Sequence, residues 1–411
     1  MHPHIYKTTN GGKSWTEIVN GLPMDPINVV KEDPKRKGLL FAGSERAVYV
    51  SFDDGEHWQS LRLNMPATSI RDLVIKDDDL VVATHGRSFW ILDNISSLRQ
   101  LNTALTNSQA ILYKPQVATR VRWNMNPDTP MPQEEPAGQN PPDGAIVDYY
   151  LNERAGDVRL EITDAKGNLI RRYTDKDTLY KIPEVNIPLY WIRPQQILSH
   201  DAGSHRFMWD LHYTPLNVPA TYPIAATYMN TAPNETSPWV APGMYTVKLT
   251  VDGKLSSFPL EVKMDPRVKT SMKDLLEIRD LALICYEGRK KSMDALDKIR
   301  DLRSQLKDRT PKASSIMAGK LNKMDITLAA LEKTTKGSTE YGFDKLSNDF
   351  AGLFNLINET EMTPTAESKA AVANAKAQME LLFGKWMNVK NEQLKTLNDE
   401  LRKEGMIALV L

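Results

Sequence analysis

Hydrophobic and polar positions change their spacing along the chain, and this divides it into three zones. Residues 5–94 contain short runs of Val, Ile, Leu, Trp and Tyr separated by Gly, Asp and Asn, which predicts strands and tight turns. Residues 110–264 also predict strands, with proline-rich interruptions. Residues 270–405 carry Leu, Met, Ala, Lys and Glu at helical spacing. We therefore expect a multidomain protein, β then α, rather than alternating βαβ units.

The first zone contains an internal repeat with an offset of 43 residues. Both copies share the pattern Ser/Thr-x-Asp/Asn-x-Gly-x-x-Trp, at residues 8–15 and 51–58. Its positions are Thr8, Asn10, Gly12 and Trp15 in the first copy, and Ser51, Asp53, Gly55 and Trp58 in the second. The pattern resembles the Asp box of BNR-repeat β-propellers, and the offset suits one four-stranded blade. A third copy, offset by 41, aligns Asn94 with Asp53 but lacks the Gly and Trp.

The chemistry of the box predicts a structural turn. Its hydroxyl and Asp/Asn side chains can bond backbone groups of the turn, and its glycine can adopt positive φ. The tryptophans can then pack as apolar plugs between blades. A glycosidase motif is the alternative interpretation, but the resemblance implies that the box lies opposite the ligand face and also occurs in non-enzymes.

Counting strands predicts an incomplete propeller over residues 1–98. The expected strands are 5–9, 14–18, 27–31, 38–43, 47–52, 57–62, 70–76, 79–84 and 88–93. They amount to about two and a quarter blades, whereas a closed ring needs four to eight. We therefore expect the chain to be the C-terminal part of a longer propeller, with the missing blades supplied by upstream chain or by another subunit.

Candidate ligand-binding residues lie in the loops between the second and third strands of each repeat, opposite the boxes. They are Glu45, Arg46, His85 and Arg87. Arg46 and Arg87 occupy equivalent repeat positions, and arginine binds carboxylates in a bidentate fashion. His85 is suited to proton transfer. Pairing between blades or simple solvation remains the alternative for all four. No catalytic set can be assembled, and Asp77–Asp79 predicts a hairpin turn.

The second zone, 110–264, predicts an Ig-like antiparallel β-sandwich. The expected strands are 117–123, 145–151, 157–163, 168–173, 204–211, 243–251 and 255–263. Hairpins are predicted at 164–168 and at Asp252-Gly253. The proline-rich insertion 126–142 is interpreted as a surface loop or a polyproline ligand. In the strand near residue 209, alternation places Asp210 and His212 on one face.

The third zone, 268–411, predicts an antiparallel helical bundle. Helices are expected at 272–308, 313–334 and 343–359, followed by one that starts at Thr363-Pro364 and runs to about 390. A short helix ending at Gly405 follows. The apolar stripes favour core packing over a partner groove, and Cys285 lies among apolar neighbours as an inert thiol.

Composition excludes several function classes. The 52 Lys and Arg balance 52 Asp and Glu, so nothing predicts nucleic-acid binding. The single cysteine excludes an intrachain disulfide and multi-cysteine metal sites. We predict no metal and no cofactor. No signal peptide or membrane span is visible in the sequence.

Four stretches together resemble the C-terminal part of large bacterial VPS10/sortilin-like BNR-repeat proteins, which are often labelled glycosyl hydrolases. They are residues 84–93 (THGRSFWILD), 140–145 (NPPDGA), 209–212 (WDLH) and 242–247 (PGMYTV). The resemblance implies an extracytoplasmic location (periplasm, outer-membrane surface or secreted) and a precursor with upstream blades. It supplies no catalytic motif that fits these residues.

Two functions remain from the sequence. The first is a non-catalytic binding or scaffolding protein whose propeller holds a protein or a glycan. The alternative is a sialidase- or xyloglucanase-like glycoside hydrolase with its carboxylates in upstream blades. Two carboxylates about 5–9.5 Å apart in an aromatic cleft would favour the enzyme.

Overall fold

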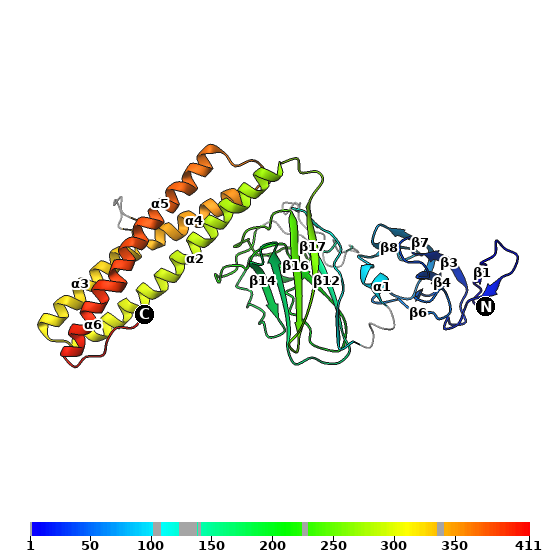
Figure 1. Cartoon of the computed structure of the whole chain (residues 1–411), viewed down its shortest axis with the longest axis horizontal. Coiled ribbons are helices and arrows are strands. Elements are labelled where there is room, and N and C mark those ends of the chain that lie inside the picture. The colour runs from blue at the N-terminus through cyan, green and yellow to red at the C-terminus, as the bar shows by residue number, and fades with distance from the viewer. Residues whose placement is uncertain (1, 102–107, 123–137, 139–140, 224–228, 335–340) are drawn as a thin grey trace. The chain divides into compact units, whose positions relative to one another are not determined.

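The computed structural model shows a mixed β and α protein with several antiparallel sheets and a C-terminal helical region (Figure 1). It describes residues 2–101, 108–122, 138, 141–223, 229–334 and 341–411. The chain divides into two compact units. The first contains Met1–Leu211, Tyr222–Ala232 and Gly243–Met264, and the second His212–Thr221, Pro233–Pro242 and Asp265–Leu411.

The first unit begins with nine short strands. They confirm the strands predicted over residues 5–93. They form a pair, β1 (Tyr6–Lys7) and β2 (Thr16–Glu17); a four-stranded sheet, β3 (Ile27–Glu32), β4 (Leu40–Ser44), β5 (Val48–Ser51) and β6 (Gln59–Ser60); and a three-stranded sheet, β7 (Ser69–Lys76), β8 (Asp79–His85) and β9 (Phe89–Leu92). All neighbours are antiparallel and follow chain order.

The two central strands of the four-stranded sheet, β4 and β5, are buried on both faces, and their side chains alternate between these faces. On one face, Leu40 and Tyr49 pack with Ile5 and Trp58 in one apolar cluster. On the other face, a second cluster joins the four-stranded to the three-stranded sheet. Its members include Phe41, Val48, Val50, Ile70, Leu73, Leu80 and Val82.

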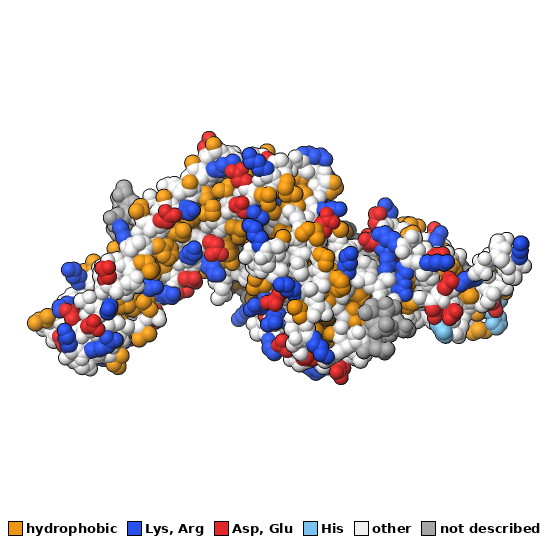
Figure 2. All heavy atoms as spheres, viewed as in Figure 1, with side chains coloured by type: hydrophobic (Ala, Val, Ile, Leu, Met, Phe, Trp, Pro, Cys, Tyr) orange, Lys and Arg blue, Asp and Glu red, His pale blue; other side chains and the backbone are white. Residues whose placement is uncertain are grey.

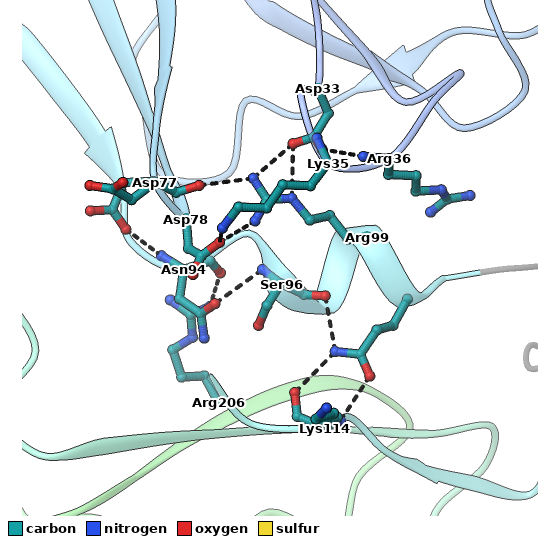
Figure 3. Close-up of polar contacts among 12 residues, drawn as sticks. Asp33, Lys35, Arg36, Asp77, Asp78, Asn94, Ser96, Arg99, Lys114 and Arg206 are labelled. Carbon is teal, nitrogen blue, oxygen red and sulfur yellow. Dashed lines mark hydrogen bonds and ion pairs between the residues drawn. The ribbon is translucent and has the colours of Figure 1, made fainter. Parts of the chain in front are cut away.

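A short helix, α1 (Ser96–Gln100), follows β9 where a fourth strand would continue the repeat. Asn94, with φ +55°, turns the chain, and its side-chain oxygen accepts from Ser96 N at 3.0 Å. Arg99 on this helix binds Asp33 and Asp78 (Figure 3). The Asp33 side chain has no exposed surface and that of Arg99 is 10% exposed. The degenerate third copy of the repeat is therefore an ion-paired helix.

The rest of the first unit contains two further sheets. A three-stranded sheet has the order β10 (Ala110–Leu112), β12 (Ala145–Leu151), β15 (Gly203–Trp209), and a five-stranded sheet has the order β11 (Ala118–Arg120), β17 (Lys254–Met264), β16 (Gly243–Val251), β13 (Val158–Asp164), β14 (Leu169–Thr174). A one-turn 3-10 helix spans Leu189–Trp191.

The structure of this region corrects one expectation, adds one strand and confirms both predicted hairpins. The expected wholly antiparallel arrangement is wrong, because β11 pairs with β17 in parallel. No tight turn joins these two strands, so no hairpin dictates their direction. The strand β10 was not predicted. Both hairpins are present, and the second has Asp252 at φ +48° and Gly253 at φ +81°. Residues 126–137 and 139–140 of the proline-rich insertion lie outside the described residues.

The second unit is mainly helical. Its elements are α2 (Met272–Arg309), a 3-10 turn (Thr310–Lys312), α3 (Ser315–Glu332), α4 (Phe343–Asn358), α5 (Ala366–Asn388), a π turn (Val389–Gln393) and α6 (Leu394–Lys403). The first three helices confirm the predicted ranges closely. The predicted start of the fourth is wrong: Thr365, not Thr363, is the N-cap, because its side chain accepts from Ser368 N. Gly405 follows α6 with φ +71°, as predicted.

His212 lies in this unit, and the strand face that it was predicted to share with Asp210 does not form. The strand ends at Trp209, and Leu211 has φ +60°, which breaks the alternation. The His212 ring packs on Trp239 with centroids 3.9 Å apart, and its Nε2 lies 3.4 Å from Glu235 Oε1. Asn358 of α4 also bonds Glu235.

Cys285 is fully buried in α2, and burial raises the pKa of its thiol to about 12. The thiolate is the reactive form of cysteine. We therefore expect iodoacetamide at pH 8 to label the native protein at least about a hundredfold more slowly than the urea-unfolded protein. Mass spectrometry over a time course measures this, and equal rates would contradict a buried thiol.

Candidate functional site

Two hairpin loops, at the ends of the four-stranded and three-stranded sheets, hold the predicted ligand-binding residues. In each loop a side-chain hydroxyl accepts from the backbone N–H of the arginine: Ser44 Oγ from Arg46 N, two residues on, at 2.9 Å, and Thr84 Oγ1 from Arg87 N, three residues on, at 3.1 Å. Thr68 joins the loops, because its N–H donates to Arg46 O at 3.2 Å and its hydroxyl to His85 O at 3.3 Å. The structure therefore brings the two loops together at one end of neighbouring sheets.

Glu45 is paired, but not with the predicted arginines. Its Oε1 accepts from Asn28 Nδ2 at 2.9 Å and from Arg71 Nη1 at 3.3 Å. Its pKa lies below the usual range because the nearby Ser69 hydroxyl and the Asn28 amide stabilise the carboxylate, with smaller effects from Arg71 and His85. Glu45 is therefore an ionised anchor for Arg71.

Arg46 projects into solvent with its side chain 77% exposed, and its Nε lies 3.8 Å from Asp25 Oδ1. Asp25 is 5% exposed, and its Oδ2 has no hydrogen-bond partner among the described residues. His85 and Arg87 are exposed. The two loops therefore present two exposed guanidinium groups and an exposed histidine, and Arg46 lies beside a buried carboxylate. Exposed guanidinium groups can hold an anionic ligand.

Sequence reasoning missed Asp25, Asn28 and Arg71. One signal was available: Asp25 lies 43 residues before Thr68, so the repeat places it at the equivalent loop position of the preceding sheet. The partners of Glu45 come from other strands, and no local pattern indicates them.

The two predicted boxes form matching turns at the opposite ends of the strands. Thr8 Oγ1 and Ser51 Oγ each accept, at 2.9 Å, from the N–H of the motif glycine four residues on. Gly12 has φ +86° and Gly55 φ +93°. The tryptophans differ: Trp58 is 4% exposed, whereas Trp15 is 59% exposed.

A cluster of metal-ligating groups lies on the second box. Ligand atoms of Asp53, Glu56 and His57 lie within 4.8 Å of one another, and all three residues are exposed. His57 Nδ1 already bonds Asp53 Oδ2 at 2.7 Å. The contact between His57 and Asp53 lies within the box turn, and the absence of a metal stays a prediction.

Two of the depressions on the described surface of the first unit have no carboxylate in their lining. One is lined by Ile182, Leu189, Tyr190, Ile192, Arg193, Pro194, Gln195 and Met229. The other is lined by residues 61–65, Val48, Leu80, Val82 and β9. The pKa of Asp93 is raised by burial and by Asp79. Asp93 lies in the turn before α1, where its carbonyl accepts from Arg206.

No protein-family model and no curated protein sequence matches this chain. Among the described residues, none of the helices combines the length and the apolar character that crossing a membrane requires. Acidic and basic side chains are interspersed on the face shown in Figure 2 rather than gathered into a patch of one sign.

Proposed function

We propose that the chain is the C-terminal portion of an extracytoplasmic binding or scaffolding protein, in which a BNR-type propeller part holds a protein or glycan. In this proposal, residues 1–98 are an incomplete propeller, 110–264 an Ig-like sandwich and 268–411 a helical bundle. The repeated sheets, with their matching box turns and similar hydroxyl-to-arginine bonds in the two loops, support the blade interpretation. Upstream chain or another subunit supplies the missing blades.

The exposed arginines of the two loops carry the proposal. Arg46 and Arg87 sit at equivalent positions of neighbouring sheets, at the end opposite the boxes, and each is exposed. Exposed guanidinium groups bind carboxylates in a bidentate fashion. We infer that the ligand carries carboxylates, as acidic glycans and acidic protein segments do.

Replacing His85 and Arg87 together by alanine should weaken binding of a carboxylated probe at least about tenfold, because two exposed polar contacts are lost. The probes are an oligogalacturonate and a Glu-rich peptide, measured by calorimetry. The unfolding curve should not change, since both side chains are exposed.

Lys76→Ala is the matched control. Its side chain is 74% exposed at the opposite end of β7, so the variant removes one positive charge without touching the site. Unchanged affinity of the double variant would remove His85 and Arg87 from the site. Release of reducing sugar from the oligosaccharide would instead favour the glycoside hydrolase.

A further inference from the structure

We call residues 406–411, which follow α6 in the second unit, the tail segment. This segment forms neither a helix nor a strand, and it runs beside α2 and α6 (Figure 1). Three side chains bind its backbone: Gln305 and Arg309, about one helical turn apart on α2, and Asn398 on α6. We call these three residues the tail site.

The two amide side chains of the tail site each exchange a pair of hydrogen bonds with one residue of the tail segment. Asn398 Oδ1 accepts from Leu409 N at 2.7 Å, and Asn398 Nδ2 donates to Leu409 O at 2.9 Å. Gln305 Oε1 accepts from Val410 N at 2.9 Å, and Gln305 Nε2 donates to Val410 O at 2.7 Å. In an extended chain, the N–H and C=O of one residue point to one side and those of the next residue to the other. The tail segment is therefore extended here, with α6 on one side and α2 on the other.

Arg309 binds the two carbonyls that come before these residues. Its Nε donates to Ile407 O and its Nη2 to Ala408 O, each at 2.9 Å. The guanidinium is itself held in place, because its Nη1 donates to Gln305 O at 3.1 Å. The tail site thus bonds backbone groups of every residue from 407 to 410. None of these bonds uses a side chain of the tail segment, so any extended peptide can form them.

One leucine anchors the tail segment, and most of its other apolar side chains are exposed. Leu409 is 3% exposed, whereas Ile407 is 79%, Val410 63% and Leu411 48% exposed. Gly405 joins the segment to α6 with φ +71°. A segment that only completed the core of the bundle would bury most of its apolar side chains. The tail segment is instead attached through its backbone and a single leucine.

We propose that the tail site is a docking site for a partner protein, and that the tail segment is an intramolecular blocking segment that occupies it. The occupant from the partner is an extended peptide segment with a leucine at the position of Leu409. This chemistry follows from the tail segment, since the site binds backbone groups that every peptide has and buries one leucine. The partner has to displace the tail segment, which is tethered to α6 and so has a high effective concentration.

Releasing the tail segment should open the site to a peptide. Leu409→Asp in the full chain releases it, because a carboxylate is not buried without a partner. The probe is a fluorescein-labelled, C-terminally amidated peptide of residues 403–411, Lys-Glu-Gly-Met-Ile-Ala-Leu-Val-Leu. By fluorescence anisotropy, we expect it to bind the variant with a Kd below about 1 mM and the wild-type chain at least about tenfold more weakly. Absence of binding to the variant, or equal binding to both chains, would overturn the proposal.

Matched variants test whether the peptide binds at the tail site. Ile407→Asp adds the same charge to an exposed position of the tail segment, so this chain should stay blocked. Adding Asn398→Ala to the Leu409→Asp chain should weaken peptide binding at least about tenfold, because both bonds to one backbone residue are lost. Binding that survives Asn398→Ala would overturn the proposed site. Circular dichroism checks that the helices stay folded, and Leu409→Ala removes the anchor without a charge if Leu409→Asp unfolds the bundle.

Sedimentation of the wild-type chain at about 100 µM tests the source of the occupant. A monomer agrees with a segment from a partner protein. Self-association that Asn398→Ala abolishes would contradict it and make the tail segment of a second copy the occupant. The inference goes beyond the proposed function and rests on neither the blades nor their ligand, so failure of the His85 and Arg87 test leaves the tail site unaffected.

Discussion

Replacing Trp58 by alanine should lower the free energy of unfolding of the first unit by about 3–5 kcal/mol. The side chain is 4% exposed and belongs to the apolar cluster on one face of the four-stranded sheet. Its loss leaves a cavity beside Ile18 and leaves Ile18 O without its indole donor. Urea unfolding followed by circular dichroism measures the change.

Trp15→Ala is the matched control, because Trp15 occupies the same motif position but is 59% exposed. We expect this variant to lose less than about 1 kcal/mol. A similar loss for both variants would show that the tryptophan acts through its own turn rather than through the neighbouring sheet.

The contrast between Trp15 and Trp58 shows what the sequence could predict. The turn of the box depends on bonds between residues two to four positions apart, such as Gly55 N to Ser51 Oγ, and a local pattern encodes these. Burial of the tryptophan depends on the neighbouring sheet, which the motif itself does not encode. Strand positions over residues 5–93 were predictable for the same local reason.

The missed features are non-local. The parallel pairing of β11 with β17 joins residues more than 140 positions apart, and no turn residue indicates its direction. The partners of Glu45 come from β3 and β7, and that of His212 from a loop more than 20 residues away. In each case the sequence showed the chemistry of one residue but not which distant residue it contacts.

Helix α1 was also missed, for a different reason. The repeat aligned Asn94 with Asp53 and suggested a degenerate box. Asn94 bonds a backbone N–H only two residues on, whereas Asn10 and Asp53 of the boxes bond one four residues on. With φ +55°, Asn94 directs the chain into a helix. The ion pairs of Arg99 with Asp33 and Asp78 hold this helix against the turns that follow earlier strands.

Replacing Arg99 by alanine should destabilise the first unit by about 3–5 kcal/mol, because it leaves a buried carboxylate without its cation. Arg99 Nε donates to Asp33 Oδ2 at 2.9 Å, and the Asp33 side chain has no exposed surface (Figure 3). Arg99 also bonds Asp78 and the Asp77 carbonyl. One substitution therefore disrupts contacts to two turns at once.

The acid dependence of stability gives a second measurement. Burial tends to raise the pKa of Asp78, but hydrogen bonds from Lys35 and Arg99 outweigh it and lower the pKa below the ordinary value. This contribution is present above the pKa of the unfolded state and is lost as the pH falls through the lower folded pKa. We expect Arg99→Ala to flatten this acid limb in urea midpoints measured at pH 3–7.

Lys76→Ala is the control for charge removal near the same turn. Its pair with Asp77 is exposed on both sides, 74% and 78%, so we expect a loss of at most about 1 kcal/mol. Asp33→Asn combined with Arg99→Met should lose less than Arg99→Ala alone, because no buried charge is left unpaired. If Arg99→Ala costs no more than Lys76→Ala, the helix is held by its apolar contacts, and the ion pairs do not explain why the third repeat departs from the other two.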